Sequence, residues 1–245
     1  MRKNKILITG SSGKFGSKLI KNKFFANSYQ PARELLDITK IVTIKNFFKK
    51  NEISKVIHVA AISNMNECEL NPHKAIKTNV DGTLNLVNVV KTQKKNIKFI
   101  YISTDGVYPV NKGNNHEDGE LGPYNVYCWT KFCAENIVKS LKNFVIIRTR
   151  FFDKDNLKFT AYADDIFTSS IEVSKLVSWI EILCKKNFKG IINIGDKKES
   201  NFNKIKIFNK YIKSCKYSDI TKDLKYQIAK DASLNLSKMR KLINN

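Results

Sequence analysis

Residues 5–16 read KILITGSSGKFG, and they set the architecture that we expect for the whole chain. The apolar run at 6–8 leads into three glycines spaced Gly-x-x-Gly-x-x-Gly, and an apolar-periodic run follows from Phe15. This order predicts a strand, a tight turn and a helix start. Glycine permits positive φ and a close approach of the backbone to a ligand, and a helix start binds phosphate. The pattern therefore predicts a dinucleotide site, with a glycine-rich hairpin as the alternative.

Length and composition are those of a globular protein with a full core. The chain has 245 residues, 42% of them hydrophobic, and no apolar run approaches the roughly 18–20 residues that span a bilayer. The cysteines are odd in number, with no CxxC or metal-type spacing: Cys68, Cys128, Cys133, Cys184 and Cys215. These features favour reduced thiols in a cytoplasmic protein, and we expect neither a metal site nor a membrane partner.

The formal net charge of +22 raises the question of nucleic acid binding. Only five of the basic residues are arginines, and the lysines are spread along the whole chain. Asn and Ile are also abundant, and these three residue types share A/T-rich codons. We therefore attribute the excess to codon composition and expect no nucleic acid partner. The positive field still helps an anionic substrate to reach its site.

Strand and helix patterns alternate along the first part of the chain. Strands are predicted at 27–30 (weakly), 55–61, 98–103, 143–148 and 190–195, and helices at 71–94, from 124 onward, at 171–185 and at 203–214. This order predicts an α/β fold, a Rossmann-like doubly wound parallel sheet covered on both faces. We expect a dinucleotide-binding domain over 1–150 and a small, trimmed substrate lobe over 151–245, interleaved with the sheet edge.

Several residues could line the cofactor side of this sheet. Arg33 follows the weak second strand, where an arginine favours NADP over NAD. Asp37 either lies beside the adenine or caps the helix that starts near Lys40. Ala60 and Ala61 end a buried strand and leave room for a flat ligand. His58 on that strand is predicted to be a packed core residue.

The candidate catalytic set is Thr104, Tyr127 and Lys131. Tyr127 and Lys131 are four residues apart on a predicted helix, so they share one face. An ammonium beside a phenol lowers its pKa, which would make Tyr127 a general acid or base. Thr104 ends a buried strand and could hydrogen-bond the same carbonyl oxygen.

The Tyr-x-x-x-Lys spacing alone is weak evidence in so lysine-rich a chain. It recurs at Tyr108/Lys112 and at Tyr226/Lys230. For those two pairs we expect a surface tyrosine beside a solvated lysine. Tyr127 is preferred because its helix follows the Thr104 strand and a polar loop.

Several motifs occur in the order typical of one enzyme superfamily. They are Thr-Gly-x-x-Gly-x-x-Gly at 9–16, IHVAA at 57–61, Asn79-x-x-Gly82-Thr83, Ser103-Thr104-Asp105-x-Val107-Tyr108, and Pro123-x-Asn125-x-Tyr127-x-x-Thr130-Lys131-x-x-Ala134-Glu135. Together they resemble an extended short-chain dehydrogenase/reductase (SDR) of the NAD-dependent epimerase/dehydratase superfamily. The segments 36–39, 103–105 and 192–195 resemble most its dTDP-4-dehydrorhamnose reductase branch.

The resemblance implies a role for each matching position. Tyr127 would be the acid/base, Lys131 would bind the nicotinamide ribose, and Thr104 would bind the substrate carbonyl. The expected cofactor-binding residues are Gly10, Ser12, Gly13, Lys14, Phe15, Gly16, Arg33, Asp37, Ile38, Ala60, Ala61, Asn79 and Lys131.

The resemblance also implies an oxidoreductase: NAD(P)H-dependent reduction of a nucleotide-linked 4-keto-6-deoxysugar for polysaccharide biosynthesis. A sugar-nucleotide epimerase with retained NAD and a non-catalytic NAD(P)-binding subunit are the alternatives. The 4,6-dehydratases of the superfamily carry glutamate where this chain has Gly106, so dehydration is not expected. The segment after Arg148 is shorter than in the reductases, and Arg150 and Phe151-Phe152 replace the usual residues there. A homodimer is compatible with the superfamily.

Overall fold

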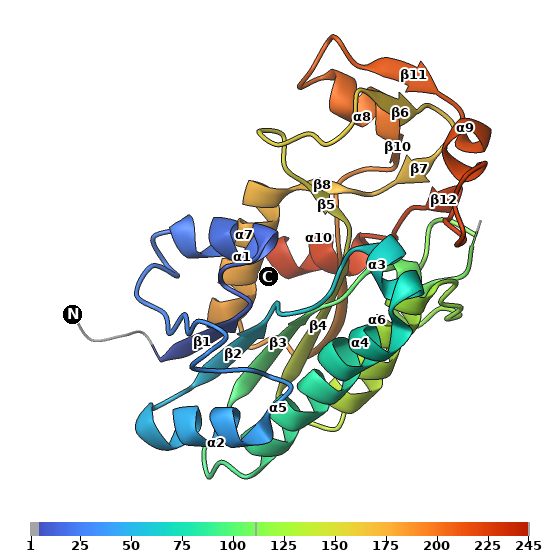
Figure 1. The fold of residues 1–245 in the computed structure, drawn as a ribbon. Coiled ribbons are helices and arrows are strands. Elements are labelled where there is room, and N and C mark those ends of the chain that lie inside the picture. Colours follow the sequence, from blue (N-terminus) through green and yellow to red (C-terminus); the bar gives the residue numbers. More distant parts are fainter. Residues whose placement is uncertain (1–4, 111, 245) are drawn as a thin grey trace.

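A computed structural model describes residues 5–110 and 112–244, and its centre is a parallel sheet of five strands (Figure 1). In sheet order the strands are β1 (Ile6–Thr9), β2 (Lys55–His58), β3 (Lys98–Ile102), β4 (Phe144–Thr149) and β9 (Gly190–Ile194). Every neighbouring pair is parallel. The expected α/β fold with a doubly wound sheet is therefore confirmed.

Helices cover both faces of the sheet because alternate strand residues point to opposite sides. Ile6 and Ile8 pack in one core with the helices α1 (Lys14–Lys21), α7 (Val173–Lys185) and α10 (Ser237–Asn244). Leu7 packs in a second core with α2 (Ile41–Lys50), α5 (Gly82–Lys91) and α6 (Val126–Val138). Each strand is buried on both sides, as its uninterrupted apolar run predicts.

Two elements of the first half differ from expectation. Residues 27–30 form only a bridge between Leu7 and Tyr29, because Pro31 follows directly and has no N–H to continue the pairing. The helix expected at 71–94 is divided into α4 (Pro72–Ile76), a π-helical turn η1 (Lys77–Asp81) and α5, and it ends at Lys91. A short helix, α3 (Met65–Leu70), precedes it.

The later residues form a lobe above the carboxyl ends of the strands (Figure 1). Its elements are β5 (Phe151–Phe152), β6 (Ala161–Ala163), β7 (Phe167–Thr168), β8 (Ile171–Glu172), β10 (Glu199–Ser200), α8 (Asn201–Lys206), β11 (Lys213–Cys215), α9 (Tyr217–Thr221) and β12 (Asp231–Ala232). The helix expected over 203–214 is wrong in its extent, since Ser200 caps α8 and residues 213–215 form a strand. Between these elements the chain returns to the main sheet through α7 and β9.

Candidate active site

The glycine turn after β1 is shaped by backbone contacts that exclude a side chain. Gly10 has a φ of +71°, and a Cβ there would lie 2.7 Å from the backbone of Ala60. A Cβ on Gly16 would lie 2.1 Å from the carbonyl oxygen of Gly10. Gly13 is the N-cap of α1 and offers no side chain to its first N–H groups. The turn thus presents uncapped N–H groups at a helix start, which is the environment that binds a pyrophosphate.

Replacement of Gly16 by alanine is expected to destabilise the protein by about 1–3 kcal/mol and to weaken NADPH binding, because the new methyl group meets backbone atoms. Gly13→Ala is the matched control for stability, since its nearest contact would be 3.3 Å at an ordinary φ. Urea denaturation and a fluorescence titration with NADPH measure both effects. Equal loss of stability in the two variants would contradict this account of the turn.

The other residues predicted to lie near the cofactor differ in their exposure to solvent. Ser12 and Lys14 are exposed at the turn. The side chain of Phe15 is buried and packs on Phe151, with 4.7 Å between the ring centres, so only its backbone remains for a ligand. Ala60 and Ala61 are half-buried just after β2, next to the turn.

The predicted adenosine-side residues form a local polar turn. Asp37 accepts hydrogen bonds from the N–H and the hydroxyl of Thr39, at 2.9 and 2.7 Å, and pairs with the exposed Arg33. Burial raises the pKa of Asp37, but these bonds outweigh it and the net shift is downward. Asp37 does not cap α2, whose N-cap is Lys40. The side chain of Ile38 is buried in the core that contains α2 and α5.

Asn79, in the π-helical turn η1, hydrogen-bonds two neighbouring segments of the site. Its Oδ1 accepts from the N–H of Ile62 at 2.8 Å, and its Nδ2 donates to the Ile62 carbonyl and to the Thr130 hydroxyl at 3.0 and 2.9 Å. Both ends of the amide are therefore occupied by protein groups. Asn79 ties the segment after β2 to α6, and π-helical turns of this kind are frequent at functional sites.

The helix α6 carries Tyr127 and Lys131 one turn apart, as predicted. Asn125 caps it by accepting a hydrogen bond from the N–H of Cys128. Lys131 is buried, and its Nζ lies 4.1 Å above the ring centre of Tyr101 on β3. Burial lowers the pKa of Lys131 to about 7, and the Glu135 carboxylate opposes that shift.

Because the pKa of Lys131 falls from 10.5 to about 7 on folding, the unfolded chain binds this proton more tightly between those pH values. Stability should therefore rise with pH across that window, by up to about 1.4 kcal/mol per pH unit from this group. Urea denaturation of the protein and of Lys131→Met, at several pH values from 7 to 10, measures it. Parallel pH dependences of the two proteins would contradict the lowered pKa.

Tyr127 differs from expectation in its pKa. Burial raises the pKa of its phenol, and Cys128 and Asp105 add to the effect, while Arg150 opposes it. The expected lowering by Lys131 is wrong for this structure, since that ammonium packs on Tyr101 instead. Tyr127 is half-buried and keeps its proton at neutral pH.

Thr104 stands at the carboxyl end of β3, where the sequence places it. Its hydroxyl accepts a hydrogen bond from the N–H of Gly106 at 3.1 Å and donates to Asp105 at 3.2 Å. It thereby caps the short 3-10 helix η2 (Asp105–Val107). Helix α6 packs against both β3 and η2, and the neighbour of Thr104, Asp105, acts on the pKa of Tyr127, so Thr104 and Tyr127 lie in one region.

Two ion pairs near these residues could not be seen in the sequence. The buried Glu135 on α6 accepts from Ser103 at 2.6 Å and from Arg148 on β4 at 2.7 Å. Arg150 donates to Asp105 through Nε and Nη2, at 2.6 and 3.0 Å. The only sequence signal was an arginine within, and another just after, an apolar strand.

The competing tyrosine–lysine pairs do not form such a site. Tyr108 is buried, contrary to expectation, and its hydroxyl donates to Asn193 and accepts from Arg148. Tyr226 lies outside any helix. His58 is a packed residue as predicted: its ring nitrogens bond the hydroxyls of Thr9 and Thr83, and burial lowers its pKa to about 3.

The chain resembles known proteins in both sequence and fold. The family model described as RmlD substrate binding domain matches residues 4–162. The dTDP-4-dehydrorhamnose reductase of Bacillus anthracis, solved with NADP, has the same fold: TM-score 0.87, 22% identity, covering 100% of this chain and 94% of that one. A hypothetical dTDP-4-dehydrorhamnose reductase from Sulfolobus tokodaii has a TM-score of 0.84 and 26% identity, covering 98% and 94%.

One curated relative carries the name of a different activity. The dTDP-D-glucose 4,6-dehydratase of Dictyostelium discoideum is 30% identical over 174 residues, which cover 56% of this chain and 40% of the relative. The chain thus spans about two fifths of the length of that relative. None of the helices in the described ranges has the length and hydrophobicity that crossing a bilayer requires.

Proposed function

We propose that this chain, which belongs to the RmlD substrate binding domain family, reduces a nucleotide-linked 4-keto-6-deoxysugar with NADPH or NADH. One observation carries the proposal: Tyr127 and Lys131 project from a helix packed on β3, whose end bears Thr104. The glycine turn lies at the same edge of the sheet, beside Ala60. A proton donor, a cation and a hydroxyl therefore flank one candidate coenzyme site.

The residues present fit a nicotinamide coenzyme, which when bound supplies the hydride. The uncapped N–H groups at the start of α1 would hold its pyrophosphate. Arg33 is exposed and would bind the extra phosphate of NADP, which favours NADP(H) over NAD(H). Ala60 and Ala61 leave space along the strand end.

The raised pKa of Tyr127 keeps its phenol neutral at pH 7, which is the protonation state from which reduction starts. A neutral phenol can donate its proton to the carbonyl oxygen as negative charge develops there. Thr104 would turn its hydroxyl proton from Asp105 to that oxygen, and Lys131 would bind a ribose hydroxyl. An epimerase with retained NAD would start instead with Tyr127 acting as a base.

Dehydration is disfavoured by the residue after Asp105. The superfamily's 4,6-dehydratases carry a glutamate at the position of Gly106. A Cβ at Gly106 would lie 2.4 Å from the Sγ of Cys128, so a glutamate would displace this buried thiol. The site thus lacks both the acid and the space for it.

Direct transfer of hydride tests the proposal. The purified protein, given a dTDP- or GDP-linked 4-keto-6-deoxyhexose and NADPH deuterated at nicotinamide C4, should yield a sugar nucleotide with one deuterium at sugar C4, read by mass spectrometry. Sugar turnover with retained NAD and no label in the product would favour the epimerase instead. Coenzyme binding without any product would favour the non-catalytic subunit.

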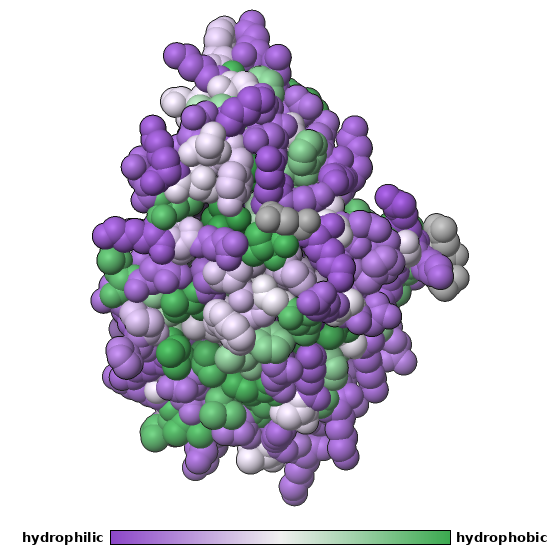
Figure 2. Space-filling view, turned by 90° about the vertical axis from the view of Figure 1, so that its right-hand side faces the viewer, coloured by the Kyte–Doolittle hydropathy of each residue, from purple (hydrophilic) through white to green (hydrophobic). Residues whose placement is uncertain are grey.

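We further propose that the protein is a homodimer joined through the outer face of α3–α6. Four large apolar side chains are exposed on this face: Leu70, Ile76, Leu84 and Trp129. Their helices contact one another, and Figure 2, which views this side, shows apolar residues gathered in its lower half. A two-fold axis lets one such patch bury itself against its copy.

Sedimentation tests this interface. Trp129→Asp should convert a dimer to a monomer, because a carboxylate would be buried without a partner. Tyr211→Asp is the control, because it also replaces an exposed aromatic side chain but lies on the distant lobe. Tyr211 is 81% exposed and Trp129 is 52% exposed. A wild-type monomer at micromolar concentration would contradict the proposal.

We propose that this activity takes place in the cytoplasm. The proposed ligands are the coenzyme and the sugar nucleotide. All five cysteines are free, which suits a reducing compartment. The lysine-rich surface would attract both anionic ligands.

A further inference from the structure

The carboxyl edge of the sheet carries a charged pair that the proposed reduction does not use. Arg150 follows β4 directly, and Asp105 follows β3 after Thr104. Ligands of open α/β sheets bind in the crevice outside these strand ends. Asp105 is 1% exposed, whereas the side chain of Arg150 is 32% exposed. The pair is therefore buried on the Asp105 side, and the Arg150 side chain is partly accessible to solvent.

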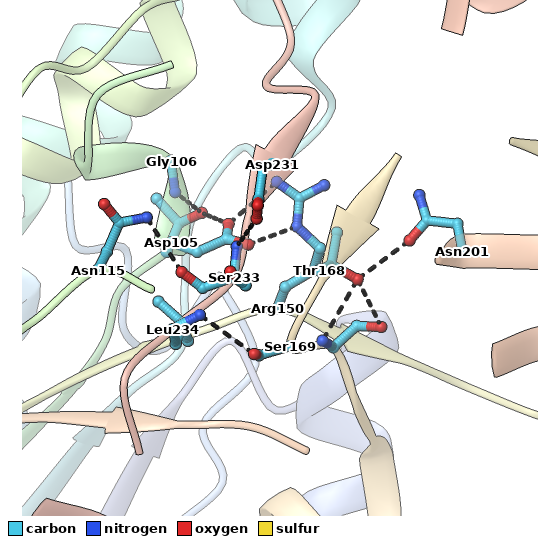
Figure 3. A network of polar contacts seen from close by, with 12 residues as sticks. Asp105, Gly106, Asn115, Arg150, Thr168, Ser169, Asn201, Asp231, Ser233 and Leu234 are labelled. Carbon is cyan, nitrogen blue, oxygen red and sulfur yellow. Dashed lines mark hydrogen bonds and ion pairs between the residues drawn. The ribbon is translucent and has the colours of Figure 1, made fainter. Parts of the chain in front are cut away.

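The geometry of the pair leaves N–H groups of Arg150 that do not bond to Asp105. Nε and Nη2 of Arg150 donate to the two carboxylate oxygens of Asp105. Figure 3 shows the guanidinium with Asp105 on one side. Arg150 also hydrogen-bonds the side chain of Tyr124. A guanidinium has five N–H bonds, and the contacts with Asp105 and Tyr124 do not use all of them.

The pair lies beside the proposed proton donor. The charges of Asp105 and Arg150 shift the pKa of Tyr127 in opposite directions. Arg150 also acts on the nearby Tyr124, whose pKa burial raises. A sugar whose carbonyl oxygen reaches Tyr127 would therefore place its neighbouring oxygens near Arg150.

We propose that Arg150 binds an uncharged oxygen of the sugar and, with Asp105, selects neutral hexoses against hexuronates. The inference rests on the proposed function for the identity of the ligand. The reason is charge balance: the bidentate pair is neutral as a whole, so a hydroxyl or carbonyl oxygen gains a hydrogen bond at no electrostatic cost. A sugar carboxylate would lose its hydration on binding, and the Asp105 carboxylate behind Arg150 would cancel most of the attraction that offsets this cost.

The pair could be purely structural, and removal of Asp105 separates the two roles. Without its carboxylate, Arg150 would keep an uncompensated positive charge that favours a sugar carboxylate. A structural pair predicts weaker binding of every sugar nucleotide. The proposal predicts that Asp105→Asn replaces the preference for a neutral sugar by a preference for a sugar carboxylate.

The experiment uses two probes that differ only at sugar C6, UDP-glucose and UDP-glucuronate, and measures their affinity for the NADP-loaded protein by calorimetry. Wild type should bind UDP-glucose at least about tenfold more tightly, and Asp105→Asn should remove or invert that ratio. Asp196→Asn, which breaks an exposed pair with Lys175, should leave it unchanged. An unchanged ratio in Asp105→Asn, or no preference in wild type, would overturn the proposal.

Kinetics give a second measurement. Arg150→Gln should raise the KM for the keto sugar about 10- to 100-fold with kcat largely retained, since it removes a charged hydrogen bond to bound sugar. Arg150→Lys keeps the charge but loses the bidentate geometry of the guanidinium, so its KM should be intermediate. An unchanged KM in Arg150→Gln would overturn the role. Absence of turnover in wild type would instead reject the proposed reaction, while the binding ratio still decides this inference.

Discussion

Replacement of Tyr127 by phenylalanine is expected to lower kcat by about 10²- to 10⁴-fold, the contribution of a positioned general acid. The change removes one hydroxyl group from a half-buried ring on the first turn of α6. NADPH binding should be unaffected, because the Tyr127 hydroxyl is not among the proposed coenzyme contacts. Steady-state kinetics with the keto sugar and a fluorescence titration with NADPH measure the two quantities.

Tyr226→Phe is the matched control for this variant. It makes the same chemical change in another tyrosine with a lysine four residues later, and that tyrosine lies outside any helix. Its kcat should equal that of the wild type. Loss of activity in both variants, or in neither, would contradict the assignment of Tyr127.

Replacement of Glu135 by glutamine should destabilise the protein by about 3–5 kcal/mol, because it leaves the Arg148 guanidinium buried without a counter-charge. Both side chains are almost completely buried, and Arg148 reaches Glu135 through Nε and Nη2. The pair joins α6 to β4, so it also fixes the helix that carries Tyr127 and Lys131. Urea denaturation measures the change in the free energy of unfolding.

Controls separate this pair from an ordinary ion pair. Glu181→Gln breaks an exposed i,i+4 pair with Lys185 and should cost under about 0.5 kcal/mol. The double variant Glu135→Met with Arg148→Met should be less destabilised than the sum of the two single changes. Additive effects would show that the two charges do not interact.

The parallel sheet and the catalytic helix could be predicted because their signals are local. Each central strand is an apolar run buried on both faces, and residues 27–30, the weak run, form only a bridge. The start of α6 follows from the side chain of Asn125, which caps it. The glycine spacing was informative because Gly10 and Gly16 contact backbone where no Cβ fits.

The lobe and the charge pairs could not be predicted because they depend on distant partners. Strand β7 has two residues and pairs with β10 and β12 from later parts of the chain, so it has no periodicity of its own. The pKa of Tyr127 was predicted from the spacing to Lys131 alone. Its environment also contains Cys128 and Asp105, and the burial that decides the shift is a tertiary property.

The most direct test of the proposed reduction is the consumption of NADPH by the purified protein when a nucleotide-linked 4-keto-6-deoxyhexose is added. We expect oxidation of NADPH that depends on the sugar, yields one reduced sugar per coenzyme and disappears in Tyr127→Phe. NADPH that stays unchanged with both dTDP- and GDP-linked keto sugars, in a protein that binds the coenzyme, would contradict the account.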